Sequence, residues 1–364
     1  MTELDDKDLA IMRTIEDYGP KISTDILSEK LGYPSRTIRY RINKLKEKGY
    51  LKPLKMKTHE RKLGLGENII VLDVNQKMQS RLLNIFKKIP YIYHYYSTYG
   101  KYNGYLIRSV FSLNQPNINL DLLDAMKRTG YISDYYIFEL VNYRIKNKDL
   151  TFFNPERGWI YKWEEWYDYL KTIKKNKEVE FNFETELDVD IVDFDYKDVM
   201  LLKNMWKDAS ITLKELKETL NLSEAQISIR IQKLEEKDII KGYYLDYSLL
   251  KTEESIYFYC FLEIEEAVNN VLSCFFKLPY QFVIYVESSN KFCISLVLDA
   301  KDFKKFLKGF DLIRPFINSY FFQFRYGKAK RADHDLFDLY NGIKKTWETA
   351  LNDYISIIEK EAEM

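Results

Sequence analysis

The chain has 364 residues, of which 46% are hydrophobic, and a formal net charge of +1. This length predicts two or more domains, and the near-zero charge excludes a molecule-wide positive field, so any basic surface that binds nucleic acid must be local. No apolar run reaches the roughly 18 residues of a membrane span, the acidic start MTELDDKDLA is not a secretory signal, and the three cysteines lack a metal-type spacing. We therefore expect a cytoplasmic protein with no membrane segment, metal or cofactor.

A repeat organises the whole chain. Residues 21–52 and 210–241 align without a gap at an offset of 189, and residues 88–91 and 277–280 keep the same offset. Self-similarity at a fixed period indicates one structural unit that is used twice.

Each unit opens with three short helical patterns. In the first unit these patterns cover about 6–18, 23–32 and 34–49. Two helices joined by a tight turn are typical of a helix-turn-helix, and the extended stretches 50–56 and 239–245 that follow predict a wing strand. In the second unit, Ser223 and Gln226 predict a capping box at the start of the third helix.

The rest of each unit alternates strand and helix patterns. In the first unit, strands are predicted at 68–74, 91–97, 102–110 and 132–141, and helices at 79–89 and 119–129. This βαββαβ order is that of a ferredoxin-like domain, and the second unit repeats it over 254–326. The fold class is therefore α+β, with two tandem units. We expect the two ferredoxin-like modules to pair about a pseudo-twofold axis within one chain.

An amphipathic helix is predicted after each ferredoxin-like module. Trp159, Trp163, Trp166, Leu170 and Ile173 are spaced for one helical face, as are the residues of the second copy: Leu336, Tyr340, Ile343, Trp347, Leu351 and Tyr354. Between the units, residues 178–195 alternate acidic and apolar residues, which predicts a charged edge strand. An alternative is that this acidic segment competes with DNA for a basic helix.

The predicted domains have the following boundaries: 1–62, first winged helix-turn-helix; 66–142, first ferredoxin-like domain; 143–192, amphipathic helix and acidic linker; 193–252, second winged helix-turn-helix; 254–326, second ferredoxin-like domain; 327–364, C-terminal amphipathic helix.

This order resembles the Lrp/AsnC family of archaeal and bacterial regulators. The segments that carry the resemblance are LDDKDLAIM, LSEKLGYPSRTIRYRINKLKEKGYLK, RKLGLG and YGKYNGYLI. The resemblance implies a regulator that binds double-stranded DNA. It also implies a small-molecule effector at the loop that contains Gly100, Tyr102 and Asn103, although Asn103 stands where the family has an acid.

The third helix of the first unit is the predicted DNA reader, because the second helix of a helix-turn-helix enters the major groove. With Ile38, Ile42 and Leu45 facing the core, Arg36, Arg39, Tyr40 and Asn43 face outward. Ser35, Lys44 and Lys46 are better placed for phosphates.

The second copy of this helix has a different outer face. Residues 34–48 carry six basic residues and one acidic residue, whereas residues 223–237 carry three of each. Because phosphate neutralisation supplies much of DNA affinity, we expect the second helix-turn-helix to be weak or structural. One reading helix per chain then predicts a homodimer on a palindromic site.

Two alternatives from other classes remain at this point. The segment 92–107 also resembles siroheme decarboxylases, in which a histidine and a Tyr-Asn pair lie by the tetrapyrrole. His94, Tyr102 and Asn103 fall at matching positions. The other alternative is a protein-interaction scaffold.

Overall fold

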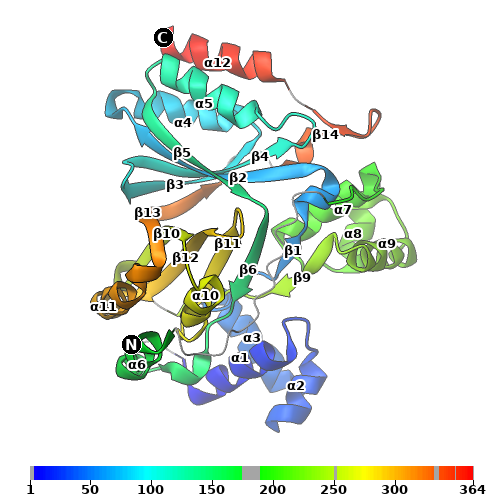
Figure 1. Cartoon of the computed structure of the whole chain (residues 1–364). Helices are drawn as coiled ribbons and strands as arrows, with labels where there is room; N and C mark the ends of the chain where they lie inside the picture. Colours follow the sequence, from blue (N-terminus) through cyan, green and yellow to red (C-terminus); the bar gives the residue numbers. More distant parts are fainter. Residues whose placement is uncertain (1–3, 174–188, 250–251, 332–335, 349, 364) are drawn as a thin grey trace.

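The computed structural model describes residues 4–173, 189–249, 252–331, 336–348 and 350–363. Within these residues, nine strands form one antiparallel sheet in the order β5-β2-β4-β3-β13-β10-β12-β11-β6 (Figure 1). The strands are β2 Leu65–Val74, β3 Ile92–Gly100, β4 Gly104–Ser112, β5 Ile132–Leu140, β6 Asn142–Lys146, β10 Ser255–Ile264, β11 Phe282–Val286, β12 Lys291–Asp299 and β13 Ile317–Arg331. The module helices are α4 Gln79–Lys88, α5 Ile118–Arg128, α10 Val268–Phe276 and α11 Phe303–Ile313. Both units therefore have the predicted βαββαβ order.

The two ferredoxin-like modules pair reciprocally within the chain. The last strand of the second module, β13, pairs with β3 of the first module. In return β6, which continues β5 of the first module, pairs with β11 of the second. The inner faces of the two halves pack through one apolar cluster that includes Ile69, Phe138 and Phe261. The expected intramolecular pairing of the modules is confirmed.

The wing strands of the two units also pair with each other. β1 Lys55–Thr58 is antiparallel to β9 Ile240–Tyr244. The amide of His59 donates to the carbonyl of Ile239 and the amide of Ser248 donates to that of Tyr50, both at 2.9 Å. These two bonds are the same bond at the offset of 189, so the wing pair obeys the pseudo-twofold relation. The first wing strand begins later than predicted, after Pro53, which has no amide hydrogen to give to a ladder.

Each helix-turn-helix has three helices. In the first unit they are α1 Asp6–Tyr18, α2 Thr24–Leu31 and α3 Ser35–Glu47, and in the second α7 Tyr196–Lys207, α8 Leu213–Leu220 and α9 Glu224–Glu236. Ser23 caps α2 by accepting from the amide of Ile26, and Gly32 ends it with a left-handed φ of 68°. The predicted capping box of Ser223 and Gln226 is present at the start of α9.

The helix-turn-helix modules pack crosswise onto the other unit. The second module shares one core with the first ferredoxin-like module, and the amide of Ala209 donates to the carbonyl of Leu54 at 2.8 Å. The first module shares a core with the second ferredoxin-like module, and the hydroxyl of Tyr247 donates to the carbonyl of Met12 at 3.4 Å. Each helix-turn-helix module is therefore held by both units.

The helix predicted after each module is shorter than its spacing suggested, because a hairpin precedes it. These elements are β7 Phe153–Asn154, β8 Gly158–Trp159 and α6 Trp163–Lys171 in the first unit, and β14 Tyr340–Asn341, β15 Thr346–Trp347 and α12 Leu351–Glu363 in the second. The side chain of Asn341 accepts from the amides of Ile343 and Lys344, which closes the turn and leaves Ile343 96% exposed. Trp159, Tyr340, Ile343 and Trp347 are thus not on a helix, which corrects that prediction.

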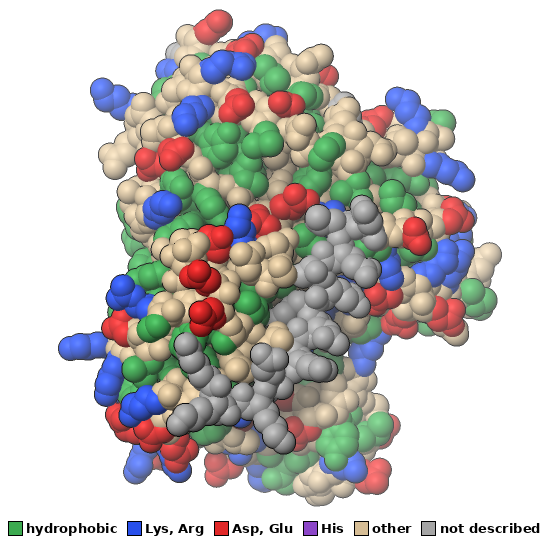
Figure 2. Space-filling view, viewed as in Figure 1, with side chains coloured by type: hydrophobic (Ala, Val, Ile, Leu, Met, Phe, Trp, Pro, Cys, Tyr) green, Lys and Arg blue, Asp and Glu red, His purple; other side chains and the backbone are tan. Residues whose placement is uncertain are grey.

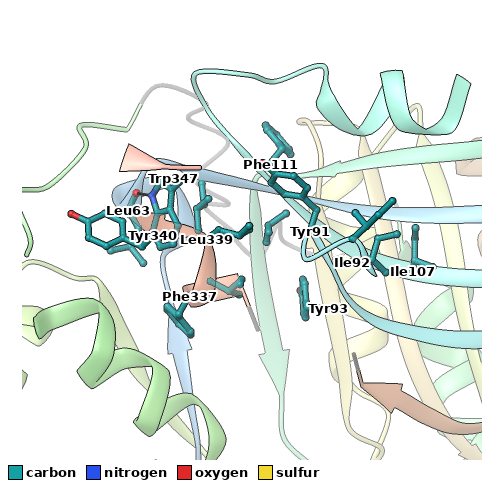
Figure 3. Close-up of a cluster of buried hydrophobic side chains, with 14 of the residues drawn as sticks. Leu63, Tyr91, Ile92, Tyr93, Ile107, Phe111, Phe337, Leu339, Tyr340 and Trp347 are labelled. Carbon is teal, nitrogen blue, oxygen red and sulfur yellow. Dashed lines mark hydrogen bonds between the residues drawn. The ribbon is translucent and has the colours of Figure 1, made fainter. Parts of the chain in front are cut away.

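The C-terminal segment covers the first module. Trp347 donates to the carbonyl of Leu63 at 2.6 Å, and Phe337 and Leu339 lie in the same cluster as Tyr91 (Figure 3). α12 lies over α4 and α5 (Figure 1). In the other unit, α6 packs on α11.

Most of the predicted acidic strand, 178–195, lies outside the described residues. Its described end, 189–195, is not in a strand. Cys260, Cys274 and Cys293 are buried, as expected. None of the helices in the described ranges is long and apolar enough to cross a membrane.

Candidate nucleic-acid interface

α3 presents an amphipathic surface. Ile38 and Leu45 are buried and Ile42 is partly buried, so these residues fix the inner face of the helix. No side chain caps its first turn, where Pro34 precedes the helix. Ser35 instead donates from its hydroxyl to Oδ1 of Asp25 at 3.0 Å, which ties the start of α3 to α2.

The outer face of α3 carries six of the seven residues predicted to contact DNA. Arg36, Arg39, Asn43, Lys44 and Lys46 are exposed, and Tyr40 is 66% exposed. Ser35 is half-buried and already bonded to Asp25. The structure therefore brings the arginines, tyrosine and asparagine onto one solvent-facing surface.

Arg41 belongs to the interior of the module rather than to this surface. Its guanidinium contacts Oδ1 of Asp5 at 2.8 Å and Oδ1 of Asp8 at 2.7 Å. Asp5 caps α1 and Asp8 lies in its first turn. Partial burial alone would raise the pKa of Asp5, but the amide of Asp8 and the Arg41 guanidinium hold it below its usual value. In the second module, Arg230 contacts Asp195 and Asp198 in the same way.

The equivalent face of α9 is exposed but nearly uncharged. Its outward residues are Glu224, Ala225, Ser228, Ile229 and Gln232. Ile229, which stands where α3 has Tyr40, is 65% exposed. α9 thus keeps the buried residues of α3 and none of its outward arginines.

Positive charge is local in this molecule. On the face shown in Figure 2, Lys and Arg side chains alternate with Asp and Glu side chains. Because the net charge is only +1, the basic surface of α3 is set by that helix and not by the field of the whole protein.

The predicted effector loop lies against the second module. Gly100 ends β3, and a Cβ there would lie 2.3 Å from the carbonyl oxygen of Phe322. Nε2 of Gln323 donates to the backbone carbonyl of Tyr102 at 2.5 Å, and Oε1 of Gln323 accepts from the backbone amide of Tyr102. Asn103 is exposed, and its amide donates to Asp73 at 3.0 Å. Gly100 and Tyr102 are thus part of the contact between the modules.

His94 lines a cavity of about 260 Å³, which we name the wing cavity. Glu60, Glu67, Tyr93 and Arg108 line it as well, and the ring of Trp206 stacks on His94 with centroids 6.0 Å apart. Glu60, Glu67 and Arg108 were not predicted from the sequence. Glu67 and Arg108 could have been found in the sequence, because each is a charged residue inside an otherwise apolar strand pattern.

Comparison with known proteins agrees with this architecture. A winged helix-turn-helix DNA-binding family model matches residues 4–52 and 194–241. An uncharacterized HTH-type transcriptional regulator from Pyrococcus furiosus is 30% identical over 109 residues, which cover 29% of this chain and 73% of that protein. The chain belongs to the family of HTH-type transcriptional regulators with a winged helix-turn-helix. In this member of the family, the winged helix-turn-helix occurs twice in one chain.

Two solved structures extend the comparison. The siroheme decarboxylase NirDL is 12% identical to this chain and superposes with a TM-score of 0.51. The superposition covers 98% of this chain and 100% of NirDL. LrpC of Bacillus subtilis is 18% identical and covers 38% of this chain and 96% of its own, with a TM-score of 0.32. At these identities the likeness to NirDL concerns the fold alone.

Proposed function

We propose that this Lrp/AsnC regulator reads the major groove of double-stranded DNA mainly with α3. The observation that carries the proposal is the difference between the twins: α3 and α9 bury the same positions, but only α3 exposes arginines. Because the fold is built without those arginines in α9, their presence in α3 has no structural cause.

The residue types on α3 match the chemistry of base edges. Arg36 and Arg39 can form paired hydrogen bonds with guanine O6 and N7, and Asn43 can do so with adenine. Lys44 and Lys46 lie further along the helix and suit phosphates, which fix the register of the protein on DNA. Ser35 remains a proposed phosphate contact through its half-buried hydroxyl.

Each chain has one arginine-rich helix, and this determines how many chains a palindromic DNA site requires. We infer that a palindromic site takes two chains, each presenting one α3, with half-sites separated by about one helical turn or a multiple. Light scattering of the free protein and of its complex with a palindromic duplex measures this directly. A single chain bound tightly to a palindrome would contradict the homodimer.

The decisive experiment compares the two helices by mutation. Arg36→Ala and Arg39→Ala should each cost about 1–3 kcal/mol of specific binding and relax base preference. Lys233→Ala, at the position in α9 that corresponds to Lys44, is the matched control and should leave affinity unchanged. Unaltered duplex binding by the Arg36 and Arg39 variants would refute α3 as the reader.

A tetrapyrrole decarboxylase is the second candidate, because His94 and Arg108 line one cavity. The chemistry of that cavity argues against it. Tetrapyrrole substrates of this kind carry several carboxylates, whereas the cavity places Glu60 and Glu67 beside a single arginine. A volume of about 260 Å³ is also below the roughly 300–1,000 Å³ of ordinary ligand pockets. A Soret-band shift when siroheme is titrated into the protein would revive this function.

A further inference from the structure

The wing cavity lies at a junction of several elements. Met56 and Thr58 of β1 and Tyr244 of β9 line it from the wing pair, and Glu67 and Arg108 line it from β2 and β4. A ligand there would contact both wing strands and the first ferredoxin-like module.

The arginine in the wing cavity is already neutralised. Arg108 forms an ion pair with Glu67, and its Nη1 donates to the hydroxyl of Tyr285 at 3.1 Å. The hydroxyl of Tyr93 donates to the same carboxylate of Glu67. Because the guanidinium is engaged on two sides, the cavity offers no ready cation to an anionic ligand.

Glu60 adds a second carboxyl group with much less compensation. The hydroxyl of Thr58 donates to its Oε1 at 2.6 Å. Burial, and then the neighbouring charge of Glu67, raise the pKa of Glu60 to about 7. The positive charge of a cationic ligand beside Glu60 would oppose that rise, because it favours the ionised carboxylate.

Aromatic rings form much of the remaining wall. Tyr143, Tyr244, Tyr285 and Trp206 line the cavity from four different elements. Rings in this wall already face cations: the Arg108 guanidinium lies 5.0 Å from the centroid of Tyr285. An aromatic wall with a carboxylate is the arrangement that recognises ammonium groups.

The pseudo-symmetric cavity of the second copy has aromatic rings and Asp246, which pairs with Lys148, but it keeps none of Glu60, Glu67, His94 and Arg108. Sheet register places Tyr257 at the position of Glu67, Val283 at that of His94 and Ser295 at that of Arg108. The offset of 189 places Leu249 at the position of Glu60. All four replacements line a cavity of about 430 Å³. The fold therefore does not require the polar set of the wing cavity.

We propose that the wing cavity binds a small organic cation, an amine or quaternary ammonium ion about the size of an amino acid. Glu60 supplies the counter-charge, and Tyr143, Tyr244 and Trp206 supply the aromatic contacts. The volume of about 260 Å³ sets the upper limit on size.

The place of the cavity gives the ligand a regulatory role, which rests on the proposed DNA-binding function. The lining residues Met56 and Tyr244 belong to the wing pair, and each wing follows directly from a helix-turn-helix. A cation that orders this pair would change the relative placement of α3 and α9, and so would act as an effector.

Calorimetric titration of the full chain tests binding without DNA. Tetramethylammonium and choline are the probes, and 3,3-dimethyl-1-butanol is the neutral counterpart of choline. We expect saturable binding of the cations and binding of the neutral alcohol that is weaker by about tenfold or more. No saturable binding of either cation, or equal binding of the alcohol, would overturn the proposal.

Substitutions locate the site. Glu60→Gln should weaken choline binding by about tenfold or more, while Glu254→Gln, an exposed carboxylate, and Ser295→Ala, in the second cavity, should not change it. Thermal unfolding of each variant checks that it is folded. If Glu60→Gln does not fold, Tyr143→Leu replaces it and should reduce the preference for choline over the alcohol. Equal affinity in a folded Glu60→Gln or Tyr143→Leu variant would contradict the assignment.

Proton release gives a further readout. The charged and titratable groups that line the wing cavity with Glu60 are Glu67, Tyr93, His94, Tyr96, Arg108, Tyr143, Tyr244 and Tyr285, and His59, Arg61 and Lys241 line a neighbouring cavity with it. Binding of a cation should ionise Glu60 and release about half a proton at pH 7, which appears as a buffer-dependent binding enthalpy. Glu60→Gln should abolish this dependence.

DNA binding is measured separately by fluorescence anisotropy, with and without saturating choline. A change in DNA affinity supports the effector role, and no change overturns that role while leaving the binding site intact. Failure of DNA binding in every condition would refute the proposed function and not the cavity.

Discussion

Arg41 and Asp8 form an ion pair, with Nη1 and Oδ1 2.7 Å apart, that ties α3 to α1. Arg230 and Asp198 repeat it at 2.6 Å in the second module, where α9 has a nearly uncharged outer face. Because the bond occurs whether or not the helix carries outward arginines, its role is to orient the helix rather than to read DNA.

Loss of this pair should therefore lower stability. Asp8 is buried, so Arg41→Ala leaves a poorly compensated carboxylate and should cost about 2 kcal/mol in the free energy of unfolding. Arg39→Ala, on the exposed face of the same helix, should change it by less than about 0.5 kcal/mol. Urea denaturation of the full chain measures both changes. An unchanged free energy of unfolding in the Arg41→Ala variant would contradict the orienting role.

A transplant of the α3 surface should create a second reading head. Replacing Ala225, Ser228, Ile229 and Gln232 by Arg, Arg, Tyr and Asn gives α9 the outward residues of α3. If each new arginine binds a guanine, as proposed for Arg36 and Arg39, a duplex with a second half-site should bind more tightly by about 1–3 kcal/mol per arginine in fluorescence anisotropy. The same four-residue variant with Ser in place of both arginines is the control. Unchanged affinity for that duplex would mean that α9 cannot reach DNA.

The repeat explains how much could be predicted from the sequence. Both copies of the helix-turn-helix share buried positions such as Ile38 and Ile227, so the boundaries of α1, α2 and α3 were predicted within about two residues. The hairpins before α6 and α12 were missed because Trp159 and Trp347 happen to have helical spacing. Their turns depend on local side-chain bonds, such as those of Asn341, which periodicity does not reveal.

The wing cavity could not have been predicted in the same way. Glu60, Glu67 and Arg108 lie on three different elements of the first unit, and no sequence motif links them. Glu67 and Arg108 meet because β2 pairs with β4, and Tyr244 of the second unit reaches the cavity because β9 pairs with β1. The second cavity forms without these charged residues. Comparison of the two cavities therefore shows that the fold does not require them, which comparison of the two sequences alone does not reveal.

Glu16 should make the chain less stable as pH rises from about 4.5 to 8. Glu16 on α1 is half-buried near Lys148 and Asp149, and burial, the largest cause, raises its pKa to about 8. Between pH 4.5 and 8 the folded state therefore holds a proton that the unfolded state has lost, so raising the pH favours unfolding. Glu16→Gln should remove this loss and be more stable at pH 8 by at least about 1 kcal/mol.

The control for that prediction is Asp17→Asn, which alters the neighbouring, exposed carboxylate. Thermal melts between pH 5 and 8.5 give the melting temperature as a function of pH. The melting temperature of Glu16→Gln should rise increasingly above that of the wild type as pH increases, whereas that of Asp17→Asn should follow the wild type at a constant difference. Equal pH dependence in Glu16→Gln and wild type would contradict the assignment of the titration to Glu16.

Gly309 in α11 should be intolerant of alanine, although alanine ordinarily stabilises a helix by roughly 0.5–1 kcal/mol relative to glycine. A Cβ at Gly309 would lie 1.9 Å from Cζ3 of Trp166, whose ring is buried and whose Nε1 donates to the carbonyl of Cys274 at 3.0 Å. Gly309→Ala should therefore cost about 1–3 kcal/mol, as overpacking of a core does. Trp166→Leu should relieve the clash, so that the double variant is more stable than the sum of the two single effects allows. Denaturant unfolding of the four proteins gives this coupling directly, with the exposed Lys304→Ala as a control for α11, and additive effects would show that Trp166 is not the cause.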